Sequence, residues 1–139
     1  MLICAIRVRG IRNIKPKIRH TLEMLGLNKV NNAIIIKDNE SLLKMLDVAK
    51  DYITYGPLNE ENAIKLIEKV YLKYRKNEAN GRDAKTILQE FLNSKNYRFP
   101  FTFRLRPPRK GYKSIKRPFS MGGALGKRAE IDSLVSRMF

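Results

Sequence analysis

The stretch AIIIKDNESLLKMLDVAKDYITYG, residues 33–56, decides the fold because it reads as strand, helix and strand in close succession. Residues 33–37 form a short apolar run typical of a buried strand. Residues 40–50 carry apolar side chains at helical spacing, which predicts a helix with one core-facing side. Residues 52–55 predict another short strand, and we expect the turn formers Gly56-Pro57 to end it.

The residues before this β-α-β unit predict one more strand and one more helix. Residues 2–9, LICAIRVR, place every second side chain on one apolar face, as a strand does. Pro16 suits the first turn of a helix, with Asn13 or a neighbour as its cap, and Gly26 is typical of a helix C-terminus. Residues 1–56 therefore predict an α+β fold, a β-α-β-α-β core with helices covering one face of a small sheet.

Two further segments follow this core. Residues 57–96 predict a helical hairpin insertion, in which acids open a first helix and Asp83 starts a second. Residues 97–105, YRFPFTFRL, alternate apolar and polar side chains, and Pro100 indicates an edge strand. Its aromatic side chains could stack on nucleic-acid bases, but burial in the core is the favoured interpretation. A short helix is expected over residues 130–138 in the final segment, 97–139.

The net charge is the strongest functional signal in the composition. The 139 residues carry a formal charge of +16 with a pI of about 10.2. The net charge is +5 over residues 1–56, +2 over residues 57–96 and +9 over residues 97–139. Such a charge destabilises a compact chain by self-repulsion unless a partner screens it, and the natural partner is the phosphate backbone of a nucleic acid. We expect the nearly neutral insertion to pack on protein.

The basic residues fall into two clusters. RLRPPRKGYKSIKRPFSMGGALGKR, residues 104–128, contains no acid, and prolines and glycines punctuate it. A solvated tail is the alternative, but the interleaved apolar residues favour docking on nucleic acid. Its candidate contacts are Arg104, Arg106, Arg109, Lys110, Tyr112, Lys113, Lys116, Arg117, Gly122, Gly123, Gly126, Lys127 and Arg128. The second cluster, between the first strand and the first helix, comprises Arg7, Arg9, Arg12, Lys15, Lys17 and Arg19, with His20 beside it.

Several kinds of chemistry are not supported by the sequence. Cys4 and His20 are the single cysteine and histidine, so an intrachain disulfide or a Cys/His zinc site cannot form. GGALGKR lacks the spacing and the hydroxyl of a phosphate-binding loop, and no nucleophile with a base can be nominated. We expect no enzyme activity and no cofactor. The apolar runs are too short for a membrane span and the first residues are unlike a signal peptide, so we expect a cytoplasmic protein.

Two quoted motifs resemble the large-subunit ribosomal protein L-thirty family, which eukaryotes have as large-subunit protein seven. TLEMLGLNKVNN, residues 21–32, followed by the stretch at 33–56, resembles the core of that family. FRLRPPRKGYKSIKRPFSMGGALGKR, residues 103–128, resembles the C-terminal extension of its archaeal and eukaryotic members. The insertion at 57–96 looks shorter than in archaeal members, and the chain starts at its first strand without the basic arm of eukaryotic members. The resemblance therefore indicates an archaeal type.

The resemblance implies a ferredoxin-like core that lies on large-subunit rRNA, with neighbouring ribosomal proteins as further partners. It adds the turn at residues 28–32 to the RNA face, with Lys29, Asn31 and Asn32 as candidate contacts. A free RNA- or DNA-binding regulator or chaperone remains the alternative function. Residues 107–128 hold too few apolar side chains to offset the cost of ordering the backbone, so we expect a mobile tail in the free protein.

Overall fold

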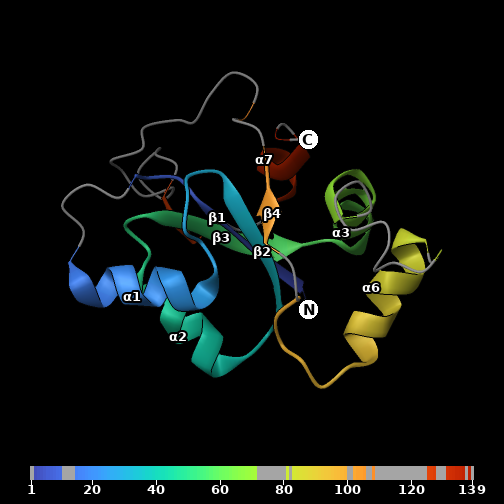
Figure 1. Cartoon of the computed structure of the whole chain (residues 1–139), viewed down its shortest axis with the longest axis horizontal. Coiled ribbons are helices and arrows are strands. Elements are labelled where there is room, and N and C mark those ends of the chain that lie inside the picture. The colour runs from blue at the N-terminus through green and yellow to red at the C-terminus, as the bar shows by residue number, and fades with distance from the viewer. Residues whose placement is uncertain are drawn as a thin grey trace.

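The computed structural model describes residues 2–10, 15–71, 81, 83–99, 102–105, 108, 125–127, 131–136 and 138. The first half of the chain folds in the predicted β-α-β-α-β order (Figure 1). Its elements are β1 (Leu2–Arg7), α1 (Pro16–Leu25), β2 (Asn32–Lys37), α2 (Glu40–Val48) and β3 (Ile53–Leu58). The later elements are α3 (Glu60–Leu66), which continues as the π-helix η1 (Ile67–Tyr71), α6 (Ala84–Asn93), β4 (Phe103–Arg104), β5 (Gly126–Lys127) and α7 (Asp132–Ser136).

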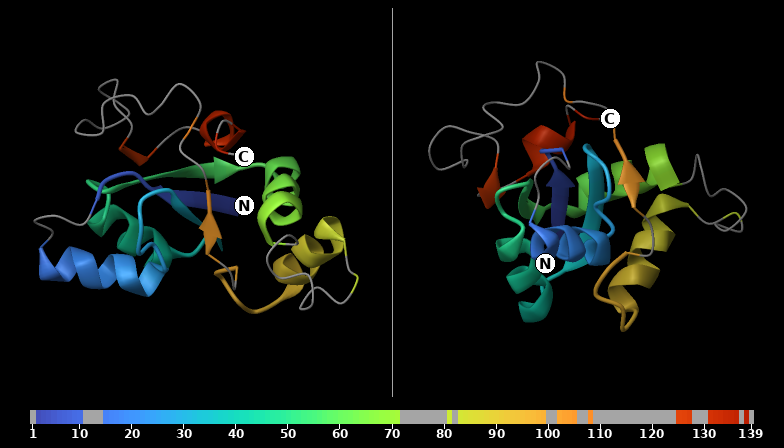
Figure 2. Two further views of the ribbon diagram at one scale, coloured as in Figure 1. Left: turned by 45° about the horizontal axis from the view of Figure 1, so that its top comes forward. Right: turned by 60° about the vertical axis from the view of Figure 1, so that its left-hand side comes forward.

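The strands form one sheet in the order β4-β2-β1-β3-β5, with β1 at its centre (Figure 2). β1 is antiparallel to both β2 and β3, β4 is antiparallel to β2, and β5 is parallel to β3. The prediction that Gly56-Pro57 ends the third strand was wrong, because β3 continues to Leu58. Proline is tolerated there because β5 pairs only with Thr54 and Tyr55. On the outer side of β3, the missing N–H of Pro57 is not needed. The Pro57 carbonyl accepts a hydrogen bond there from the backbone N–H of Ile131.

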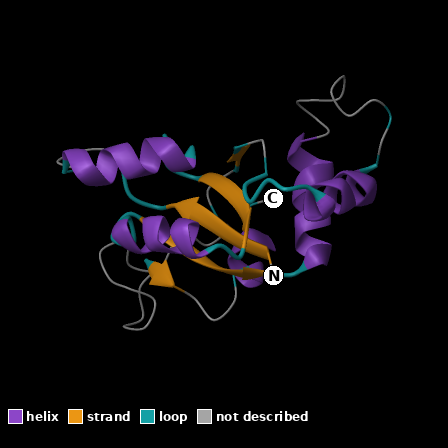
Figure 3. Cartoon of the chain, turned by 90° about the horizontal axis from the view of Figure 1, so that it is seen from below, coloured by secondary structure: helices purple, strands orange, loops and turns teal. Residues whose placement is uncertain are grey.

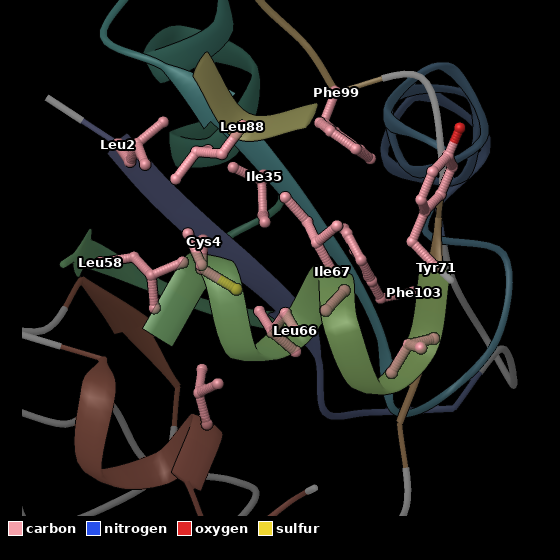
Figure 4. Packing of buried hydrophobic residues seen from close by; sticks show 14 of the residues in the cluster. Leu2, Cys4, Ile35, Leu58, Leu66, Ile67, Tyr71, Leu88, Phe99 and Phe103 are labelled. Atoms are coloured by element: carbon pink, nitrogen blue, oxygen red, sulfur yellow. The ribbon is translucent and has the colours of Figure 1, made fainter. Parts of the chain in front are cut away.

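Helices cover both faces of the sheet, whereas the sequence predicted one covered face (Figure 3). On one face α1 and α2 bury Ile3, Ala5 and their neighbours on β2 and β3. On the other face α3, η1, α6 and α7 bury Leu2, Cys4 and Ile6, in the cluster shown in Figure 4. The second face was missed because the period-two pattern assigned only every second residue of β1 to the core, although all six of its residues are buried.

The aromatic segment after α6 packs in the core, but it is not one continuous strand. Within its described residues, Arg98 forms an isolated bridge to Ile36, and only β4 joins the sheet further on, at its edge as predicted. Phe99 is 1% exposed, and its ring lies 5.3 to 5.6 Å from the rings of Tyr71, Phe91 and Phe103. Burial therefore excludes Phe99 and Phe103 from base stacking. Tyr97, predicted to share their face, is 52% exposed.

The helix ends follow local sequence signals with one exception. Asn39, Asn59 and Asp83 each cap a helix by accepting a backbone N–H with the side chain. Gly26 closes α1 at φ 83°, as predicted, and the backbone N–H of Leu27 donates to the carbonyl of Leu22, which is the pattern of a Schellman motif. The exception is the start of α1, where the cap residue is Lys15 and its side chain makes no capping bond. Asn13, the predicted cap, lies outside the described residues.

Candidate nucleic-acid interface

The predicted contact residues that the structure describes gather where β1 ends and where β2, β3 and β5 begin, a place we call the basic end of the sheet. Asn32 pairs with Arg104 of β4, and Arg7 pairs with Ile53 of β3. The backbone N–H of Asn31 donates to the carbonyl of Arg7 over 2.8 Å. Segments that are far apart in the sequence therefore meet in one row across the sheet, because each strand begins or ends at this level.

Arg7 lies beneath the surface of the basic end. It is 2% exposed, although the sequence placed it in an exposed cluster. Its Nη1 donates to the carbonyl of Leu27 over 2.8 Å and its Nε donates to the carbonyl of Arg9 over 3.0 Å. The exposed contact predicted for Arg7 is therefore corrected: the strand alternation directs its side chain toward the α1 and α2 layer, where the guanidinium ties the α1–β2 connection to the end of β1.

Arg9 is half-buried against the turn that precedes β3. Its guanidinium carbon lies 5.2 Å from the centre of the Tyr52 ring, and its Nη1 donates to the carbonyl of Asp51 at 3.5 Å. The Tyr52 carbonyl accepts from the backbone N–H groups of both Val8 and Arg9. Tyr52 thus fixes the direction in which Arg9 leaves the sheet. The sequence predicted Tyr52 only as part of a strand, and no local pattern linked it to Arg9.

The first turns of α1 present cations and no acid. Lys15, Lys17, Arg19 and His20 are all exposed, as a phosphate contact requires. The side chain of the cap residue Lys15 makes no capping bond to the first turn, whose backbone N–H groups suit an anion, and the helix dipole adds to this preference. The Nε of Arg19 lies 4.0 Å from the carboxylate of Glu23. Both side chains are exposed, so this ion pair is weak. The side chain of Arg19 therefore remains available to a polyanion.

The turn before β2 forms the middle of the basic end. Lys29 is exposed, whereas Asn32 is 8% exposed and begins the strand. Asn31 adopts φ 69°, a left-handed conformation that asparagine tolerates better than most residues. Its carbonyl accepts from the backbone N–H of Leu105, directly after the exposed Arg104 of β4. The turn therefore joins β1 to the point where the basic stretch 104–128 leaves the sheet.

The same stretch rejoins the sheet at the opposite edge. Gly126 pairs with Thr54 and Lys127 with Tyr55, and the buried Thr54 hydroxyl donates to the Gly126 carbonyl over 3.1 Å. Leu125 is buried together with Val8. The predicted tail at 107–128 is therefore corrected at its C-terminal end, where residues 125–127 pack on the sheet. Two anchors, at Leu105 and at residues 125–127, hold the basic stretch at the basic end.

Much of the predicted contact set lies outside the described residues. These residues are Arg12, Arg106, Arg109, Lys110, Tyr112, Lys113, Lys116, Arg117, Gly122, Gly123 and Arg128. The anchoring partners Thr54 and Leu105 were not expected, since only strand pairing reveals them. Among the described residues, no group of three or more His, Cys, Asp or Glu side chains could hold a metal ion. In the same part of the chain, no helix has the length and apolarity to cross a bilayer.

Comparison with known proteins gives a consistent result. The family model described as ribosomal protein L30p/L7e matches residues 4–53. The large ribosomal subunit protein uL30 of Methanococcus vannielii is 34% identical, over 99% of both chains, and that of Methanobrevibacter smithii is 33% identical, also over 99% of both. The uL30 protein of Methanosphaera stadtmanae is 35% identical over 96% of this chain and 97% of its own length. The alignment with the Methanococcus vannielii protein spans 157 positions, so that protein has residues that this 139-residue chain lacks.

Proposed function

We propose, since this chain belongs to the ribosomal protein L30p/L7e family, that it binds large-subunit rRNA through the basic end of its sheet. The family is ribosomal, so the role is that of a structural component of the large subunit and not of an enzyme. In this proposal residues 1–56 and 97–139 supply the interface, and residues 57–96 are a packing insertion. The protein would then work in the cytoplasm, within the archaeal type of large subunit.

One observation carries this proposal: exposed cations from separate segments lie at the same end of the sheet. Lys15 caps α1, Lys17 and Arg19 lie in its first turns, Lys29 lies in the turn before β2, and Arg104 ends the edge strand β4. The five side chains are all exposed. The backbone beneath these five cations is held by the buried side chains of Arg7 and Asn32 and by the ring of Tyr52. A rigid array of cations suits folded RNA, because little ordering entropy is lost when it binds phosphates.

The interaction we propose is dominated by the phosphate backbone. Lysine and arginine neutralise phosphates and release counterions, which makes binding steeply dependent on salt. Two of the aromatic side chains that could have stacked on bases, Phe99 and Phe103, are buried in the core, whereas Tyr97 is exposed. Contacts with phosphate and sugar position a protein without reading sequence. We therefore expect recognition of the folded shape of rRNA, with Arg104 and its neighbours as the anchor points.

A pair of double variants tests the proposed surface. K17Q/R19Q removes two exposed cations from the basic end, whereas K85Q/K95Q removes two exposed cations from α6 and the turn after it. Both variants have the same net charge. The first should bind an rRNA fragment more weakly, with a log–log salt slope about two units shallower, and the second should stay close to the unmodified protein. Equal losses in both variants would show that net charge alone drives binding.

Sedimentation tests the ribosomal assignment itself. The protein should run with large subunits at moderate salt and leave them as the salt concentration rises. Arg104→Ala should flatten the slope for rRNA by about one unit, because it removes one phosphate contact. Arg117→Ala should do the same, although this residue lies outside the described part of the chain. A protein that stays in the soluble pool would favour a free nucleic-acid-binding regulator or chaperone instead.

A further inference from the structure

Arg7 is a buried cation for which the described part of the chain supplies no carboxylate. It lies on the same face of β1 as Ile3 and Ala5, beneath α1 and α2. Its Nη1 and Nε donate to backbone carbonyls, but its Nη2 is buried and has no hydrogen-bond partner there. The three ion pairs between described residues are all exposed pairs within helices, and none of them includes Arg7.

The electrostatic surroundings of Arg7 are unfavourable in the free protein. Burial is the main cause that lowers the pKa of its guanidinium, the charge of Arg19 lowers it further, and Tyr52 acts in the opposite direction. Arginine nevertheless keeps its proton in proteins, so the positive charge persists. A buried charge without an opposite charge destabilises the fold, and a buried donor without an acceptor adds to this. The basic end therefore contains both a charge and a donor that the described chain leaves unsatisfied.

We propose that the counter-ion of Arg7 is a phosphate group of the bound RNA, so that RNA binding completes an anion site at the basic end. This inference rests on the function proposed above. A guanidinium is well suited to phosphate, because its planar N–H groups form charge-assisted bonds with phosphate oxygens. The backbone carbonyl of Arg9 and the charge of Arg19 act on Arg7, and Gly10 is exposed, with no atom of the described residues within 4 Å of a β-carbon placed there. A phosphate that reaches Nη2 would satisfy both the charge and the donor.

The site differs from an exposed contact in a measurable way. An exposed lysine adds affinity and has little effect on the stability of the fold. Arg7 also adds affinity, but its charge is unfavourable in the free protein, so phosphate by itself should stabilise the fold. Removal of Arg7 relieves the buried charge and loses its hydrogen bonds to two backbone carbonyls, two effects that oppose each other. The free protein should therefore change little in stability, while it loses both RNA affinity and the response to phosphate.

Three variants test the inference: R7M removes the charge and keeps the length, R7K keeps the charge without the fork, and K85Q removes an exposed cation from α6 as the control. Affinity for a large-subunit rRNA fragment is measured across potassium chloride concentrations, and melting of each free protein is followed as inorganic phosphate replaces chloride at constant ionic strength. R7M should melt within a few degrees of the unmodified protein and bind RNA about tenfold more weakly. R7K should recover most of this loss. Phosphate should raise the melting temperature of every protein except R7M.

Several results would overturn the inference. R7M could bind RNA as the unmodified protein does while K17Q/R19Q binds weakly, in which case the proposed function stands and the anion site does not. R7M and R7K could lose affinity equally, which would make Arg7 only a clamp for the backbone. Phosphate could stabilise R7M as much as the unmodified protein. If R7M does not fold, the phosphate response of R7K decides, and no response would count against the site. Loss of RNA binding by the unmodified protein would refute the proposed function itself.

Discussion

Gly26→Ala offers a sharp test of how the sequence builds the support for the basic end. Gly26 ends α1 at φ 83°, and a β-carbon there would lie 2.2 Å from Nη2 of Arg98 and 2.9 Å from the hydroxyl of Thr102. Arg98 occupies this space because its Nε donates to the carbonyl of Leu25 and its Nη2 donates to Thr102. Alanine would therefore force the Arg98 guanidinium away from the end of the helix.

The magnitude follows from two separate contributions. A left-handed alanine costs about 1 to 2 kcal/mol. The Arg98 guanidinium is the end of a flexible, half-exposed side chain, so its displacement exchanges two hydrogen bonds partly for water and costs about 0.5 to 1 kcal/mol for each bond. We therefore expect Gly26→Ala to lower the free energy of unfolding by about 3 kcal/mol. A domain of this size has roughly 7 to 20 kcal/mol in total, so the variant should still fold.

Gly81→Ala is the matched control. Gly81 has φ 77°, but a β-carbon there would meet no atom of the described residues within 4 Å, so we expect alanine to cost the left-handed strain of about 1 to 2 kcal/mol. Urea unfolding of both variants measures the difference, and Arg98→Ala provides the second leg of a double-mutant cycle. In an Arg98→Ala background the cost of Gly26→Ala should fall most of the way to that of Gly81→Ala, because only the contact with the Thr102 hydroxyl remains. Equal costs for the two glycines in the unmodified background would refute the contact argument.

Three further predictions concern the core and the anchors. In the free protein, the backbone amides of residues 126–127 should exchange with solvent more slowly than those of residues 111–124, for which the sequence predicts fast exchange. Equally fast exchange in both segments would contradict the β5 pairing. Burial raises the pKa of Cys4 from 9.0 to about 12, so the thiol stabilises the fold below pH 9, and this stability is lost as the pH rises from 9 toward 12, by about 1.4 kcal/mol per unit. Cys4→Ala should show a shallower loss over that range, and an unchanged pH profile would count against this cause. Phe99→Ala should lower the free energy of unfolding by about 3 to 5 kcal/mol, and a loss under 1 kcal/mol in urea unfolding would show that its three ring contacts are not tight.

Local signals in the sequence were enough for most of the elements. The 3.6-residue spacing after Pro16 and the glycine at position 26 set the two ends of α1 within a residue. Asp83 was identified as the start of α6 because a carboxylate that accepts N–H bonds marks a helix start in any context. The prediction of one continuous strand over residues 97–105 was wrong. Alternation of apolar and polar residues indicates which side chains can share a face, but it does not show that a partner strand exists to pair with the segment.

The sequence by itself determined the β-α-β-α-β order, the charge that favours a polyanionic partner and the cations of the proposed interface. These properties follow from composition and from contacts between residues close in the chain. Only the tertiary structure decided which cations are exposed, because burial depends on what packs over each face of a strand. Arg7 and Arg19 belong to one basic cluster in the sequence, yet Arg7 is buried and Arg19 is exposed. It also brought Leu105 and Gly126 to the same end of the sheet, since strand pairing joins segments that no local pattern connects.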